Sequence, residues 1–229
     1  YHEGDLGDGA SLAAAIKEST PDEVYNLGAQ SFVGTAWRQP ELTANVTGLG
    51  ALRLFEAVRE HAPGARVYQA SSSEMFGTGN GEPQTVDHPL RPRNPYGVAK
   101  VFAHLAARNY RESYGMYIAC GILFNHESPL RGNEFVTRKI TLAVARIRKG
   151  VQAELRLGNL DACRDWGFAG DYVQAMWAML QQDIPGDYII GTGASHSVED
   201  FCGIAFEHAG LRHENYVRID ERLLRPAEV

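Results

Sequence analysis

The chain has 229 residues, 44% hydrophobic and 22% charged, a length and composition typical of one large or two small globular domains. Its formal net charge of −6 argues against a general nucleic-acid-binding protein, whose surface would be basic. The longest apolar stretch, residues 116–124, is too short to cross a bilayer, so a membrane protein is not expected.

The cysteines indicate the cellular compartment. Cys120, Cys163 and Cys202 lie far apart, and an odd, scattered set suggests neither a disulfide framework nor a zinc site. The first residues do not have the pattern of a secretory signal peptide. We therefore expect a cytoplasmic protein in which no metal takes part.

The first half of the chain alternates between predicted helices and strands. Asp8 is a suitable N-cap for a helix that ends at Ser19, and Glu23–Leu27 has the composition of a strand. A long helix is expected over Pro40–Glu60, followed by a strand over Arg66–Ala70. Residues 77–92 are polar and rich in glycine and proline, which predicts a loop.

The next helix has a clear start signal. Asn94 can cap it, and Pro95 suits the first helical position. Met116–Leu123 is a nearly uninterrupted apolar run, which is typical of a strand buried on both faces. The inner face of the helix is expected to consist of its apolar residues Val98, Val101, Phe102 and Leu105.

Beyond Asn125 the alternation loosens, but helices and strands are still predicted. Repeated strand–helix–strand units imply an α/β fold with a doubly wound parallel sheet, whose ligands bind beyond the carboxyl ends of the strands. We expect the loops after Leu27, Ala70 and Phe124 to share one crevice. The remaining predicted elements are helix Glu134–Lys149, a strand near Leu155, helix Gly170–Gln181, strand Asp187–Ile190 and helix Val198–Ala209.

Tyr96 and Lys100 stand four residues apart, on one face of their predicted helix. A phenol with a pKa of about 10 is a poor base at neutral pH. An ammonium about 4 Å away, at an effective dielectric near 20, favours the phenolate by about 4 kcal/mol, or roughly three pKa units. The pair could therefore act as a general base for an alcohol. A buried tyrosine beside a lysine that reaches solvent would give the same pattern.

The segment QASSSEMFG, Gln69 to Gly77, stands at the end of a predicted strand, about 20 residues before this helix. A serine hydroxyl in this loop could hydrogen-bond the substrate oxygen that Tyr96 deprotonates. The arrangement resembles the extended short-chain dehydrogenase/reductases, which oxidise a sugar hydroxyl with NAD(P) through a Ser/Thr, a Tyr and a Lys. The resemblance implies that Ser72 is the catalytic hydroxyl.

Glu74 narrows the choice between the reactions that members of this family catalyse. Once C4 of a sugar is a ketone, its C5 proton is acidic, so a carboxylate two residues after the catalytic hydroxyl can remove that proton while the C6 hydroxyl leaves as water. This suits a 4,6-dehydratase, whereas sugar 4-epimerases of the family usually have no acid here. Glu74 could instead cap a turn or pair with an arginine.

Further segments resemble the GDP-mannose 4,6-dehydratase family over essentially the whole chain. The resemblance implies conversion of GDP-mannose to GDP-4-dehydro-6-deoxymannose with NADP, NAD being less favoured, and a homo-oligomer, either a dimer or a tetramer. The segments are GDLGDGASL (Gly4 to Leu12), YNLGAQSFV (Tyr25 to Val33), NYRESYGM (Asn109 to Met116), LFNHESPLRG (Leu123 to Gly132), FVTRKI (Phe135 to Ile140), LGNLDACRDWG (Leu157 to Gly167) and LRPAEV (Leu224 to Val229).

The resemblance also assigns site residues. Ser72 stands where the family usually has threonine, and the hydroxyl is retained. The catalytic residues would be Ser72, Glu74, Tyr96 and Lys100. The cofactor-binding residues would be Asp5, Leu6, Leu27, Gly28, Ala29, Gln30, Ser31, Lys100, His126 and Arg131. Besides Ser72, Glu74 and Tyr96, the substrate-binding residues would be Asn125, Val136, Lys139, Arg164, Arg225 and Glu228.

Residues 131–149 hold six Lys/Arg and one acid, which suits a diphosphate clamp but also a solvated helix face. The glycine-rich turn G-x-x-G-x-x-G of the family does not occur, so we expect a Rossmann-like fold lacking its first β-α-β unit. Residues 1–124 would form the truncated dinucleotide-binding part with the catalytic residues. Residues 125–229 would mainly bind the nucleotide-sugar, with some segments returning to the sheet. Other readings are a different nucleotide-sugar dehydratase or epimerase, or a cofactor-free inactive fragment.

Overall fold

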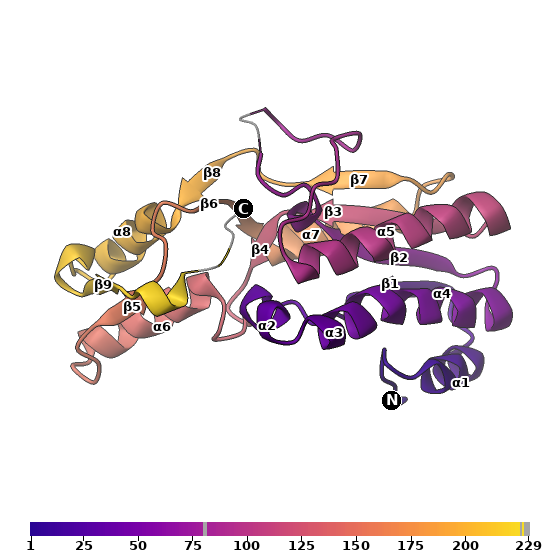
Figure 1. Cartoon of the computed structure of the whole chain (residues 1–229), viewed down its shortest axis with the longest axis horizontal. Coiled ribbons are helices and arrows are strands. Elements are labelled where there is room, and N and C mark those ends of the chain that lie inside the picture. Colours follow the sequence, from indigo (N-terminus) through magenta and orange to yellow (C-terminus); the bar gives the residue numbers. More distant parts are fainter. Residues whose placement is uncertain (80–81, 225, 227–229) are drawn as a thin grey trace. The chain divides into compact units, whose positions relative to one another are not determined.

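The computed structural model describes residues 1–79, 82–224 and 226. They form two compact units, whose elements are labelled in Figure 1. The first unit consists of Tyr1–Leu123 and Asp171–Ile190, and the second consists of Phe124–Gly170 and the described residues from Gly191 onward. No helix in the described part of the chain is both long and apolar enough to cross a membrane.

The first unit contains a parallel sheet with strand order β1-β2-β3-β7. All six residues of β3 are buried, as predicted for a strand covered on both faces. Helices α4 and α5 pack against one face and α7 against the other (Figure 1), which confirms the doubly wound α/β fold. The strands are β1 (Glu23–Asn26), β2 (Arg66–Ser72), β3 (Ile118–Leu123) and β7 (Asp187–Ile190).

The predicted capping residues begin two helices. The Asp8 side chain accepts a hydrogen bond from the Ala10 amide at 3.0 Å, and Asn94 Oδ1 accepts one from the Gly97 amide at 2.8 Å. These bonds satisfy amides of the first helical turn that have no partner within the helix. The long helices of this unit are α1 (Gly9–Ser19), α4 (Gly50–His61), α5 (Pro95–Tyr114) and α7 (Ala169–Leu180), of which Ala169 and Gly170 belong to the second unit.

The helix predicted over Pro40–Glu60 is divided. After the short α2 (Val33–Arg38), the chain forms α3 (Pro40–Thr43), a π-helical turn (Ala44–Leu49) and α4. The π turn places Gly48 against α5, where an added Cβ would lie 3.5 Å from the Ala99 carbonyl oxygen. The local widening of the helix thus accompanies a close approach to α5, a feature that hydrophobic periodicity does not reveal.

The prediction for the inner face of α5 is wrong for three of its four residues, while Val101 packs against a buried cluster. Val98, Phe102 and Leu105 are 55%, 44% and 48% exposed, and Val101 is half-buried. Small alanines let the helix lie close to the sheet, and its polar residues on this face have hydrogen-bond partners. The buried residues are Gly97, Ala99, Lys100, Ala103, His104, Ala107 and Tyr110.

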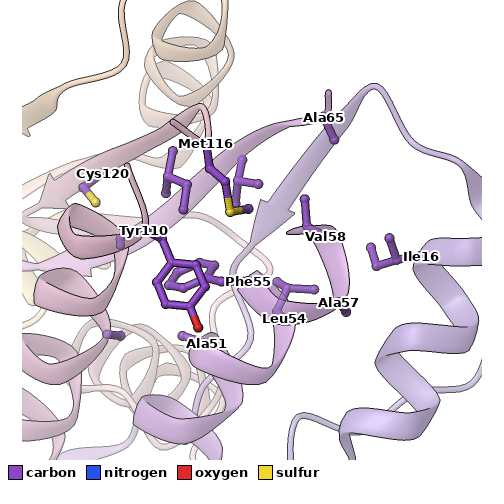
Figure 2. Packing of buried hydrophobic residues seen from close by; sticks show 14 residues of the cluster. Ile16, Ala51, Leu54, Phe55, Ala57, Val58, Ala65, Tyr110, Met116 and Cys120 are labelled. Carbon is purple, nitrogen blue, oxygen red and sulfur yellow. The ribbon is translucent and has the colours of Figure 1, made fainter. Parts of the chain in front are cut away.

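The largest core cluster joins α1, α4 and α5 to the sheet. Figure 2 shows Ile16, Leu54, Phe55 and Tyr110 around this core. The Phe55 and Tyr110 rings lie 5.8 Å apart between centroids, in a tilted arrangement typical of buried aromatic pairs. This packing fixes α5 against α4 and the sheet.

The second unit has shorter strands. In one sheet, β6 pairs parallel with β4 and antiparallel with β8, and elsewhere β5 pairs with β9. Its apolar core joins α6 and α8, both of which were predicted, as was a strand near Leu155. The elements are β4 (Asn125–Glu127), α6 (Val136–Arg148), β5 (Leu155–Leu157), β6 (Cys163–Phe168), β8 (Ser195–Ser197), α8 (Val198–His208) and β9 (Val217–Ile219), with 3-10 turns at Ser73–Met75, His213–Asn215 and Glu221–Leu223.

Candidate active site

The carboxyl ends of β1 and β2 lie at the same edge of the parallel sheet. Asn26 pairs with Gln69 in the register, and its Nδ2 donates a hydrogen bond to Gln69 Oε1 at 2.7 Å. The segment after β1 therefore comes close to the end of β2, as expected for a ligand-binding edge. The third predicted loop, after Phe124, belongs to the second unit.

Ser72 and Glu74 stand where β2 ends. Ser72 Oγ accepts a weak hydrogen bond from the Glu74 amide at 3.3 Å and caps the 3-10 turn that follows. Glu74 Oε2 accepts a hydrogen bond from Asn94 Nδ2 at 2.6 Å. Asn94 is buried and also caps α5, so one side chain orients the carboxylate relative to the start of that helix. The sequence identified Asn94 only as a cap, because a capping motif does not show where the second amide atom points.

Tyr96 and Lys100 share a face of α5, as predicted. Lys100 Nζ lies 5.7 Å from the centroid of the Tyr96 ring and donates a hydrogen bond to the Ala70 carbonyl oxygen at 2.7 Å. Burial lowers the pKa of Lys100 to about 8. The amine is still mostly protonated at neutral pH, so a cation lies beside Tyr96, and such a cation favours the phenolate form of a tyrosine.

Several of the residues expected to bind the cofactor meet near the end of β1. Leu6 packs against Gly28, where an added Cβ would lie 2.5 Å from Leu6 Cδ1. Asp5 Oδ1 accepts a hydrogen bond from the Gly7 amide at 2.6 Å. Arg53 Nη1 donates to the Leu6 carbonyl oxygen at 2.9 Å and holds this loop on α4. Arg53 was missed from the sequence, because α4 carries other charged residues, such as Glu56 and Arg59, and nothing in the pattern distinguishes Arg53 from them.

The segment after β1 is anchored but accessible. The Gln30 amide donates to Thr47 Oγ1 at 3.0 Å, and Gln30 Oε1 accepts from the Phe32 amide at 2.8 Å. Leu27, Gly28 and Ser31 are exposed, and Ala29 is half-buried. A fixed, exposed backbone beyond a strand end can contact a bound ligand.

The remaining candidates lie in the second unit. On β4, Asn125 pairs with Trp166 in the register, and the His126 Nδ1–H donates to the Phe124 carbonyl oxygen at 2.9 Å. The Arg131 guanidinium stacks 3.6 Å from the centroid of the Phe135 ring, with its Nε 3.2 Å from Glu127.

The cationic candidates of this unit are already partly engaged. Val136 begins α6, and Lys139, one turn later, donates from Nζ to the Arg156 carbonyl oxygen at 2.7 Å. Burial lowers the pKa of Lys139, and the charge of Asp220 partly opposes this shift. Arg164 Nη1 donates to the Cys163 carbonyl oxygen at 2.7 Å. Arg225 and Glu228 lie outside the described residues.

Comparisons with known proteins agree on one family. The family model for GDP-mannose 4,6 dehydratase matches residues 1–229. The chain is 53% identical over 232 residues to GDP-mannose 4,6 dehydratase 1 of Arabidopsis thaliana, covering all of this chain and 64% of that protein. It is 46% identical over 247 residues to the human GDP-mannose 4,6 dehydratase, covering all of this chain and 66% of that protein.

A solved structure with a similar fold is RMD from Pseudomonas aeruginosa complexed with NADPH. Its TM-score is 0.88 at 25% identity, and the match covers 96% of this chain and 74% of that one. The chain thus spans somewhat less than two thirds of the Arabidopsis relative and most of a structural neighbour.

Proposed function

Because the chain belongs to the GDP-mannose 4,6-dehydratase family, we propose that the protein containing it removes water from GDP-mannose to give GDP-4-dehydro-6-deoxymannose. The proposal concerns the whole protein, since this chain spans 64% of the Arabidopsis relative. One observation carries it: Asn94 joins the Glu74 carboxylate to the first turn of the helix that bears Tyr96 and Lys100. A base for C5 would therefore lie beside a base for the C4 hydroxyl.

NADP is the proposed cofactor, in line with the NADPH in the RMD structure, and NAD is the less favoured alternative. The chain fits two ends of such a molecule. Lys100 offers a buried amine near Tyr96 for the nicotinamide ribose, and Leu6, which follows Asp5 in the chain, packs beside Gly28 for the adenine end. Bound there, NADP would supply the acceptor for the C4 hydride and the source of the hydride returned to C6. Leu27 to Ser31 would contact the cofactor between these ends, and His126 and Arg131 are further proposed contacts.

The first chemical step needs a proton acceptor and a fixed substrate oxygen. Tyr96, as phenolate, takes the proton of the C4 hydroxyl, and the charge of Lys100 favours that phenolate. The Ser72 hydroxyl donates a hydrogen bond to the same oxygen. The C4 ketone that results makes the C5 proton acidic.

Glu74 is the proposed base for the elimination of water. Its carboxylate takes the C5 proton, the C6–O bond breaks, and Glu74 passes that proton to the departing hydroxyl, which leaves as water. When hydride reaches C6, Tyr96 gives the proton taken from the C4 hydroxyl to C5. Asn94 orients the carboxylate through the 2.6 Å hydrogen bond. The proton transfer requires an ionised carboxylate, and the Asn94 bond engages one of its two oxygens, Oε2.

The nucleotide-sugar is proposed to bind mainly to residues 125–229, and the dinucleotide to residues 1–124. Guanidinium and ammonium groups are natural partners of a diphosphate. Lys139 keeps two N–H donors beyond its bond to the Arg156 carbonyl oxygen. The proposed contacts are Asn125, Val136, Lys139, Arg164, Arg225 and Glu228, together with Ser72, Glu74 and Tyr96.

We also propose that the protein is a cytoplasmic homo-oligomer, either a dimer or a tetramer. The apolar face of α5 borders a cavity of about 720 Å³ whose lining includes Trp37, Leu49, Val98 and Phe102. An exposed apolar patch of this kind marks an interaction surface more often than a bare surface of a monomer.

The activity is tested with the full-length protein, GDP-mannose and NADP. Mass spectrometry should show a nucleotide-sugar lighter by one water, whereas a product of unchanged mass would indicate an epimerase and contradict the dehydratase proposal. Calorimetry of residues 1–229 with NADP addresses the cofactor-free reading, which measurable binding would exclude.

A further inference from the structure

A buried polar cluster lies between α5 and the sheet, in the first unit. His104 is 2% exposed, and its Nδ1 lies 2.9 Å from Ser71 Oγ. The other ring nitrogen, Nε2, lies 3.8 Å from Asp187 Oδ2, and Arg111 donates to Asp187 Oδ1 at 2.6 Å. The cluster therefore links α5 to β2 and to β7, and neither Ser71, His104 nor Asp187 has a part in the chemistry proposed above.

A metal site is the first alternative, because ligand atoms of His104, Cys120 and Asp187 all lie within 4.8 Å of one another. Arg111 opposes it, since its guanidinium contacts both Asp187 and, at 3.7 Å, Cys120 Sγ. Burial raises the pKa of Cys120 to about 12, so the thiol stays protonated, whereas a metal requires a thiolate. A fixed cation and a neutral thiol do not suit a second cation.

The position of His104 on the helix suggests another role. Lys100 and His104 lie one turn apart on the same face of α5, and they bond Ala70 and Ser71, consecutive residues of β2. The next residue of the strand is Ser72. The bond between His104 and Ser71 therefore holds the backbone of β2 against α5 immediately before Ser72.

The protonation of the ring follows from its neighbours. A neutral imidazole with its proton on Nε2 directs that N–H toward Asp187 and leaves Nδ1 to accept from the Ser71 hydroxyl. Burial lowers the pKa of His104; Asp187 opposes the shift, and Arg108 and Arg111 add to it. The neutral ring therefore prevails at neutral pH.

We propose that His104 is a positioning residue, which accepts the Ser71 hydrogen bond and thereby fixes the end of β2 against α5, so that the Ser72 hydroxyl and the Tyr96 phenol reach one substrate oxygen. The inference rests on the proposed function. It concerns the spacing between two catalytic groups and not substrate affinity. A loss should therefore appear in kcat and leave KM nearly unchanged.

The test uses the full-length protein with His104→Phe, Ser71→Ala, the double variant and His104→Asn. The first two should lower kcat about tenfold, as the loss of one hydrogen bond allows, and the double variant should be no worse than either. His104→Asn should recover most of the rate, because its Oδ1 can take the place of Nδ1. Tyr110→Phe is the matched control: it removes a hydroxyl that donates to Glu56 from the same helix, and should leave kcat unchanged.

The proposal is wrong if His104→Phe retains the wild-type kcat, if the losses of the two single variants multiply, or if Tyr110→Phe lowers kcat as much. If His104→Phe does not fold, the kcat values of Ser71→Ala and His104→Asn are compared with that of the wild type instead. A wild-type protein that leaves GDP-mannose unchanged would refute the proposed function instead. In that case thermal unfolding of the same four variants tests the hydrogen bond between His104 and Ser71. Non-additive shifts in Tm support the bond, and additive shifts overturn it.

Discussion

In the proposed reaction Glu74 serves the elimination of water and not the oxidation at C4, so its replacement should separate these two steps. In Glu74→Gln the amide cannot take the C5 proton, and we expect water loss to slow at least about a hundredfold, the usual contribution of a general base. Reduction of NADP on adding GDP-mannose should persist. Glu60→Gln, an exposed glutamate on α4, is the matched control. Unchanged turnover in Glu74→Gln would remove Glu74 as the base.

A second prediction at the scale of the residue concerns Lys100 and the way the free energy of unfolding depends on pH. Its pKa of about 8 in the folded protein lies below the ordinary value of 10.5, so between these values the unfolded chain binds more protons. Wild-type stability should therefore rise with pH across this window relative to Lys100→Met, by up to about 3 kcal/mol. Denaturant unfolding of both proteins from pH 7 to 10.5 measures the difference. A constant difference would show that the amine is not desolvated.

At the scale of the element, the structural features that depend on neighbouring residues were predicted from the sequence. The features that depend on contacts with distant parts of the chain were missed. The caps Asp8 and Asn94, the buried strand β3 and the pair Tyr96 and Lys100 were all correctly located. The inner face of α5 was not. Val98, Phe102 and Leu105 are exposed, because alanines allow closer packing on the sheet and Lys100 and His104 find partners there. Hydropathy cannot anticipate partners supplied by another strand.

Replacing a glycine inside a helix by alanine usually stabilises a protein, but close packing at Gly97 should reverse this effect. At Gly97 in α5 an added Cβ would lie 2.7 Å from the Glu74 carbonyl oxygen, so Gly97→Ala should push the helix start from the catalytic loop. We expect a lower Tm and lower activity. Gly203, inside α8, has open space, its nearest neighbour being His213 Nδ1 at 4.0 Å. Gly203→Ala should instead stabilise by about 0.5–1 kcal/mol. Equal shifts in Tm for the two variants would contradict the close packing at Gly97.

At the scale of the whole molecule, the exposed apolar face of α5 is the proposed contact surface between copies of the protein. Val98, Phe102 and Leu105 follow one another at helical spacing, and all three are close to half exposed. On a helix that also carries Tyr96 and Lys100, a contact between copies would couple assembly to the geometry of the site. The proposed homo-oligomer would therefore use the residues that the sequence pattern had assigned to the core.

A charge placed on this face tests the proposal. Phe102→Glu should convert the full-length protein from an oligomer to a monomer in light scattering, because a carboxylate cannot be buried there without a partner. Val173→Glu, at another exposed apolar position, on α7, is the matched control and should leave the mass unchanged. Dissociation by both variants would indicate general destabilisation, and an oligomer that survives Phe102→Glu would place the interface elsewhere. If activity falls together with mass, the catalytic helix depends on its contact with a second copy.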